Sequence, residues 1–238
     1  MRLAILLLSF SWTLARAQLQ TLDVNGAGIG FGSVKFNNPA LIGEKGKVDY
    51  SEIRGNYFWD NQWSPGILVL SNNSAVKLRK VRMNLYTNEV HYIDNKNVEL
   101  AANNSIVKKV LLLDRKDSTK VTAVFENFAS YKTRGIESFA QVLNQGKAQL
   151  LKRVTVTVKK GEYDVMMGKS ELSFVWTTDY FILNDGKITL LKRINKEGLF
   201  SILEPNDEYE AWLKSTKNRL KSEEDLLAFL TFYNTQKK

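Results

Sequence analysis

The chain has 238 residues, 44% of them hydrophobic, and its 34 basic and 25 acidic side chains give a formal net charge of +9 at neutral pH. It contains no cysteine and one histidine. Thiolate catalysis, iron–sulfur clusters, structural cysteine–zinc sites and histidine-rich metal centres are therefore excluded, and we assign no cofactor and no metal ligand.

The first 17 residues predict a signal peptide. Met1 and Arg2 precede an apolar run over residues 3–14, and Ala15-Arg16-Ala17 is the small-x-small pattern of a cleavage site. The run is too short for a transmembrane helix, which needs about twenty apolar residues. We expect cleavage after Ala17, export to the periplasm or the outer membrane, and no transmembrane helix in the mature chain. An N-terminal core helix is the alternative.

Residues 18–55 read as a leader rich in glycine and asparagine. Glycines alternate with other residues over 26–32, whereas a dinucleotide-binding fingerprint needs the spacing G-x-G-x-x-G. We interpret this run as a glycine-faced strand or a flexible leader. A β domain over 56–195 and a helical appendage over 196–238 complete the predicted organisation.

The stretch Gly66–Asp114 predicts a meander of short antiparallel strands separated by turns such as Asn95-Lys96. Apolar residues alternate up to Leu78 and again from Val81, but the two sets lie in opposite phase. A β-bulge at Arg79 and Lys80 would absorb this slip.

Two further hairpins are predicted after the meander. Val154, Val156 and Val158 alternate with threonines in a strand pattern, and Asp185-Gly186 between apolar runs is a strong hairpin signal. The segment Gly161–Ser170 fits a loop or a short strand equally well.

The C-terminal region predicts helices. Asn206 and Ser222 are suitable N-caps, and acidic residues follow Ser222 in the first turn. The second helix carries an apolar stripe, Leu226, Leu227, Leu230 and Tyr233, which we expect to dock on the sheet. A partner-binding peptide is the alternative.

These elements predict a mainly β protein whose antiparallel meander forms a strongly curved sheet or open barrel, with two or three C-terminal helices. An outer-membrane barrel is the alternative architecture. The apolar strand at residues 106–113 and the helical C-terminus disfavour it, because lipid-facing strands alternate polar and apolar residues.

Aromatic and polar residues that suit sugar binding come just before the meander: Tyr57, Trp59, Asp60, Asn61 and Trp63. Aromatic rings stack on the apolar face of a pyranose while amides and carboxylates bond its hydroxyls. The same residues would also anchor a loop over the end of a β core.

Basic residues occur in pairs, including Arg79 and Lys80, and Lys152 and Arg153. If these pairs gather on one sheet face, they would hold an anionic glycan, lipopolysaccharide or phospholipid headgroups. The alternative is a solvated strand face whose lysines discourage aggregation. Nucleic acid is not expected, because no recognition motif is present.

Catalytic signals are weak, and we assign no catalytic residue. His91 lies inside a predicted strand, which favours a sheet histidine with a hydrogen-bond partner over a Ser-His-Asp arrangement. A carboxylate pair would need two acids in one cleft. Nothing in the spacing selects a pair from the candidates Asp49, Glu52, Asp60, Asp164 and Glu171.

Three stretches carry a resemblance to known proteins. They are Trp63-Ser64-Pro65-Gly66-Ile67-Leu68-Val69-Leu70, Asn84-Leu85-Tyr86-Thr87-Asn88-Glu89-Val90-His91-Tyr92, and the closing segment from Lys221-Ser222-Glu223-Glu224-Asp225-Leu226-Leu227 to Tyr233-Asn234. Over residues 55–238 the chain resembles uncharacterised exported proteins of Bacteroidota. The resemblance implies a bacterial cell-envelope setting and supplies no catalytic residues.

Three classes of function follow. The first is a non-catalytic binding or interaction module whose partner is an envelope glycan, a lipid or another envelope protein. The second is a carrier of a lipid or small apolar ligand in a cavity inside the sheet. The third is a hydrolase, which would need a cleft that gathers two acids or joins His91 to a serine.

Overall fold

A computed structural model describes residues 32–33, 50, 53–131, 138–164 and 168–236. The predicted signal peptide and most of the predicted leader lie outside the described residues. The described residues comprise the β domain, the C-terminal helices and a few residues of the predicted leader.

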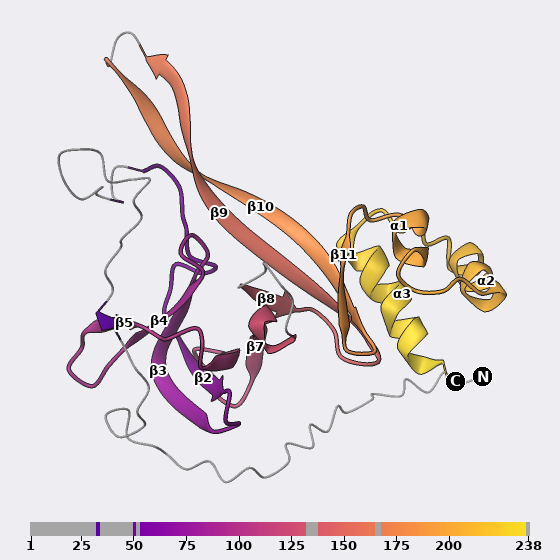
Figure 1. The fold of residues 1–238 in the computed structure, drawn as a ribbon, viewed down its shortest axis with the longest axis horizontal. Helices are drawn as coiled ribbons and strands as arrows, with labels where there is room; N and C mark the ends of the chain where they lie inside the picture. Colours follow the sequence, from indigo (N-terminus) through magenta and orange to yellow (C-terminus); the bar gives the residue numbers. More distant parts are fainter. Residues whose placement is uncertain (1–31, 34–49, 51–52, 132–137, 165–167, 237–238) are drawn as a thin grey trace.

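The strands are β1 (Gly32–Ser33), β2 (Ser64–Leu70), β3 (Ala75–Asn84), β4 (Glu89–Ile93), β5 (Glu99–Ala101), β6 (Val107–Leu113), β7 (Val121–Asn127), β8 (Phe139–Val142), β9 (Ala148–Asp164), β10 (Lys169–Asn184) and β11 (Lys187–Leu191). Among the described residues they form one antiparallel sheet in the order β1-β5-β4-β3-β2-β6-β7-β8-β9-β10-β11 (Figure 1). The helices α1 (Lys196–Phe200), α2 (Asp207–Thr216) and α3 (Glu223–Thr235) follow the sheet. The predicted mainly β fold with C-terminal helices is confirmed.

Several local predictions are also confirmed. Asp185 and Gly186 form a two-residue turn between β10 and β11 with φ values of 49° and 76°, the positive pair typical of a type I′ turn. Asn206 and Ser222 cap α2 and α3, where each side chain accepts a backbone N–H, at 2.9 and 3.2 Å. The segment Gly161–Ser170 belongs to the distal end of the β9–β10 hairpin as far as it is described.

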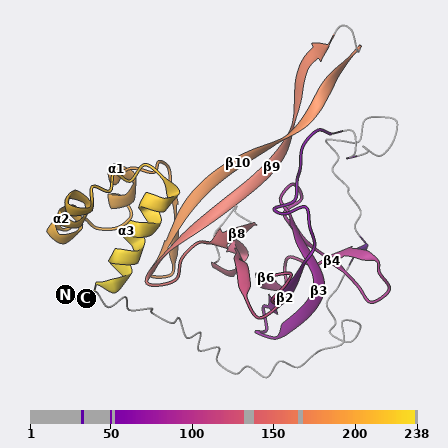
Figure 2. The same cartoon turned by 180° about the vertical axis from the view of Figure 1, so that it is seen from behind.

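The sheet curls without closing. Residues 53–59 lie between its two arms, where Arg54 forms a parallel bridge with Ser173 of β10 and Phe58 forms an antiparallel bridge with Asn84 of β3. The β9–β10 hairpin extends past the rest of the sheet, and the three helices gather at its opposite end (Figure 1, Figure 2).

Apolar side chains fill the inside of the curl. Leu68, Val81 and Val110, from β2, β3 and β6, have no exposed surface. Val156 and Phe174, from the β9–β10 hairpin, belong to the same cluster. Burial of these side chains, at about 25 cal/mol for each Å² of apolar surface, is the main source of stability in this part of the fold.

The apolar stripe of α3 packs on the sheet, as predicted. Leu226, Leu230 and Tyr233 are buried in one cluster with Leu150 of β9 and Ile182 of β10. The stripe therefore stabilises the contact between the helices and the sheet.

We expect replacement of Gly146 by alanine to destabilise the fold more than the same change at Gly186. Both glycines have positive φ, 133° and 76°. A Cβ atom at position 146 would lie 2.4 Å from the Asn234 side chain, whereas one at position 186 would meet nothing within 4 Å. The expected losses of unfolding free energy are about 1 kcal/mol at Gly186 and about 2–4 kcal/mol at Gly146. Urea denaturation measures both, and equal losses would contradict the close contact.

Candidate functional site

The predicted bulge lies in β3 and turns two consecutive basic side chains toward solvent. Pairing of β3 with β2 jumps from Leu78 to Val81, so Arg79 and Lys80 together lie opposite Pro65. Leu78 and Val81 are both buried, and Arg79 and Lys80 are both exposed. A strand without a bulge would have placed one of the two basic residues in the core.

The bulge forms one wall of a groove of about 360 Å³. The opposite wall is the end of β4 and the turn that leads to β5. The lining residues are Lys77, Leu78, Arg79 and Lys80 on the first wall and Ile93, Asp94, Asn95 and Asn97 on the second.

The groove carries positive charge that no ion pair among the described residues neutralises. Lys77, Arg79 and Lys80 are exposed, and none of them takes part in an ion pair within the described part of the chain. The carboxylate in the lining, Asp94, accepts the backbone N–H groups of Lys96 and Val98 at 2.9 and 2.8 Å. Asp94 therefore shapes the turn and leaves the three cations without a bound counter-charge.

The other predicted basic pair lies elsewhere and is neutralised. Lys152 Nζ lies 2.8 Å from the Glu223 carboxylate of α3, and Arg153 pairs with Asp179 of β10 at 2.6 Å. Consecutive residues of a strand point to opposite faces. The four residues predicted to bind an anion therefore do not form one surface. Of these four, only Arg79 and Lys80 line the groove.

The residues predicted to bind a sugar have four different surroundings. Tyr57 and Trp59 are half-buried against the core inside the curl. Asp60 forms an ion pair with Arg115. Trp63 lies under the guanidinium of Arg82, and Asn61 is exposed. This distribution fits the alternative, in which the segment anchors a loop over the β core.

A polar network that the sequence did not predict lies beneath this loop. His91, which has no exposed surface, has Nδ1 2.6 Å from a Glu99 carboxylate oxygen. Glu99 also accepts two hydrogen bonds from the Arg82 guanidinium, at 2.8 and 3.0 Å. The guanidinium in turn lies over the rings of Phe58 and Trp63, 3.6 and 4.1 Å from their centroids. His91 is thus a sheet histidine with a hydrogen-bond partner, as the sequence favoured.

We expect His91 to make stability depend on pH. Burial alone would lower its pKa, but hydrogen bonds to Glu89 and Glu99 and their charges outweigh burial and raise the pKa above its ordinary value of 6.5. The resulting stabilisation is complete below pH 6.5 and is lost as the pH rises through the folded-state pKa.

Urea unfolding at a series of pH values measures this contribution. The difference in unfolding free energy between the native protein and His91→Gln should shrink as the pH rises above 6.5. A difference that stays constant with pH would show that folding does not change the proton affinity of His91.

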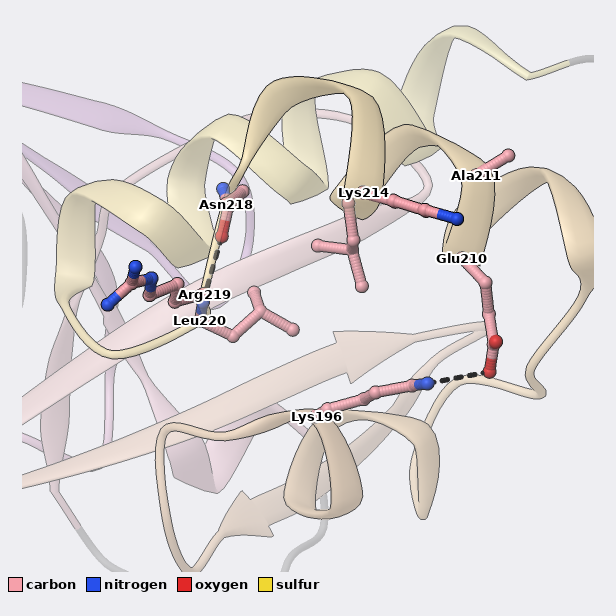
Figure 3. Close-up of a pocket in the computed structure, with 8 residues that line it drawn as sticks. Lys196, Glu210, Ala211, Lys214, Asn218, Arg219 and Leu220 are labelled. Carbon is pink, nitrogen blue, oxygen red and sulfur yellow. Dashed lines mark hydrogen bonds and ion pairs between the residues drawn. The ribbon is translucent and has the colours of Figure 1, made fainter.

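A second pocket, of about 440 Å³, lies among the helices (Figure 3). Lys196, Lys214 and Arg219 are among its lining residues. Lys196 is paired with Glu210 at 2.7 Å. Lys214 and Arg219 lie near the C-terminal end of α2, where the backbone carbonyl groups disfavour an anion. This pocket is therefore the weaker candidate for binding an anion.

Comparisons with known proteins give no relative: no family model, no curated protein and no solved structure matches the chain. Within the described ranges, no group of three or more histidine, cysteine, aspartate or glutamate side chains could hold a metal ion. No helix in those ranges is long and apolar enough to cross a bilayer. The function is therefore inferred from the groove itself.

Four polar residues of the groove were not singled out as site residues from the sequence: Lys77, Asp94, Asn95 and Asn97. The alternation of β3 places Lys77 on the same face as Arg79, so the pattern contained a signal for this residue. Asn95 was expected only as a turn residue, and no role was expected for Asn97. Their approach to the bulge depends on the pairing of β3 with β4, in which Val81 lies opposite Tyr92.

Proposed function

We propose that the protein is a non-catalytic binding module of the bacterial cell envelope and that it holds an anionic envelope component in the groove. The observation that carries this proposal is the convergence of three exposed cations, Lys77, Arg79 and Lys80, without ion-pair partners among the described residues. Three cations against the one carboxylate of Asp94 leave the lining with a net positive charge, and a concave surface with a net charge attracts ligands of opposite charge. The predicted signal peptide and the resemblance to exported Bacteroidota proteins support the envelope setting.

The two other classes of function have less support. A carrier needs an empty interior, whereas aromatic and aliphatic side chains occupy the inside of the curl, with the Trp59 ring packed edge-on against Phe125 at 5.4 Å. A hydrolase built on His91 needs an imidazole that reaches a substrate, and this ring is fully buried. Neither the filled interior nor the buried histidine argues against binding in the groove.

Neutralising the groove should abolish most of the binding to a generic polyanion. At about 1 kcal/mol for each solvated charge contact, replacement of Lys77, Arg79 and Lys80 by glutamine should weaken binding of dextran sulfate on the order of 100-fold. Isothermal titration calorimetry at low ionic strength measures the affinity. Added salt should weaken binding to the native protein, because exposed charges are screened.

The matched control removes the same charge elsewhere. Lys159, Lys160 and Lys192 are exposed and lie outside the groove. Their replacement by glutamine should change the affinity by less than about threefold. If both triple variants lose affinity equally, binding follows net charge alone and the groove is not the site.

A further inference from the structure

We infer that the ligand of the groove is an acidic sugar, a pyranose ring that carries a carboxylate. This inference rests on the proposed function and names the class of ligand that the same site takes. It is drawn from the second wall of the groove, whose chemistry a site for a bare phosphate would not need.

The second wall supplies hydrogen-bonding groups that suit hydroxyls. The side-chain amides of Asn95 and Asn97 make no hydrogen bond to another described residue, and both line the groove opposite the cations. An amide can both donate and accept a hydrogen bond, which is what the hydroxyls of a sugar require. A phosphate oxygen at neutral pH mainly accepts hydrogen bonds. It would use the N–H donors of each amide and leave the amide oxygen without a donor.

The carboxylate of Asp94 points to the same class of ligand. A hydroxyl can donate to a carboxylate, whereas a phosphate close to Asp94 would be repelled by its charge. The cations on the first wall and the carboxylate on the second therefore suit a ligand with one acidic group and several hydroxyls. A uronic acid has this composition.

The size and the apolar surface of the groove agree with this class. Its volume of about 360 Å³ lies in the range of small-molecule sites and exceeds what a single phosphate fills. Ile93 is half-buried in the lining, and Lys77, Arg79 and Lys80, which line the same groove, have long aliphatic stems. Such stems offer apolar surface against which a sugar ring can pack while the charged ends stay in water.

The test compares four probes on the full protein by isothermal titration calorimetry. They are a galacturonate trisaccharide, a neutral galactose trisaccharide, inorganic phosphate, and phosphatidylcholine vesicles that contain phosphatidylglycerol. We expect the uronate to bind at least about tenfold more tightly than each of the others. Equal binding of the neutral sugar would overturn recognition of the acid, and equal binding of phosphate or vesicles would overturn recognition of the sugar.

Variants of the second wall separate this inference from the proposed function. Asn97 has a positive φ of 61°, so Asn97→Gly removes the amide and keeps the backbone conformation. The double variant Asn95→Ala, Asn97→Gly should lose about tenfold in uronate affinity and keep its affinity for dextran sulfate. An unchanged uronate affinity would overturn the acidic sugar alone. Retention of dextran sulfate binding after neutralisation of Lys77, Arg79 and Lys80 would overturn the proposed function as well.

Discussion

Replacement of Arg82 by leucine is expected to lower the free energy of unfolding by about 2–4 kcal/mol. The Arg82 side chain is 17% exposed and holds both oxygens of the Glu99 carboxylate, which also contacts His91. Without the guanidinium, Glu99 keeps its charge in a partly buried position with one partner fewer. The rings of Phe58 and Trp63 lose the cation that lies over them.

Arg54 provides the matched control for Arg82. It pairs with Glu171 at 3.6 Å, and the two side chains are 78% and 65% exposed. Surface ion pairs contribute little, so Arg54→Leu should change stability by less than about 1 kcal/mol. Guanidinium chloride denaturation monitored by tryptophan fluorescence measures both variants. Similar small losses would show that the network beneath the loop adds nothing to the fold.

Replacement of Asn234 by alanine is expected to cost about 2–3 kcal/mol of unfolding free energy. Its side chain accepts the backbone N–H of Ala148 at 2.8 Å and donates to the carbonyl oxygens of Ala148 and Gln145 at 2.9 and 3.2 Å. These bonds tie the last turn of α3 to the turn before β9. Ala148 is fully buried, so its N–H would find no water to replace the lost acceptor.

Thr231, on an exposed position of the same helix, is the control for Asn234. Its hydroxyl donates to the carbonyl of Leu227 within α3 at 2.8 Å, and the residue is exposed. Thr231→Ala should leave stability within about 0.5 kcal/mol of the native value. If Asn234→Ala is equally mild in thermal denaturation, the helices are held by apolar packing alone.

The local structure could be predicted because its signals lie in short stretches of sequence. The slip in apolar phase at Arg79 and Lys80 requires a bulge whatever the rest of the chain does. Positive φ at Asp185 and Gly186 follows from the needs of a two-residue hairpin. The caps of the helices depend only on one side chain and the N–H groups that follow it.

The curl of the sheet and the state of each cation could not be predicted, because they depend on distant contacts. Lys152 is neutralised by Glu223, which lies on a helix far along the chain. Arg153 is neutralised by Asp179, which lies opposite it in the β9–β10 hairpin. The sequence did not predict this pairing, because the segment Gly161–Ser170 fitted a loop and a short strand equally well. Four basic residues therefore looked equivalent in the sequence, and only Arg79 and Lys80 stay unpaired within the described residues.

The aromatic segment before the meander shows the same limit. Its composition suits a sugar site, but the segment bridges two arms of the sheet, and its side chains have different surroundings. Tyr57 and Trp59 face the core, whereas Phe58 faces the network of Arg82. Which of these side chains face the core depends on the position of the segment between β3 and β10, and composition does not contain that position.

The central claim, that the bulge of β3 creates a groove that binds an acidic sugar, is tested most directly by amide NMR spectra of isotopically labelled protein titrated with the galacturonate trisaccharide. We predict saturable shifts confined to residues 77–80 and 93–97, which line the groove. Saturable shifts at residues 210–220, around the pocket among the helices, or no shifts at all, would contradict it.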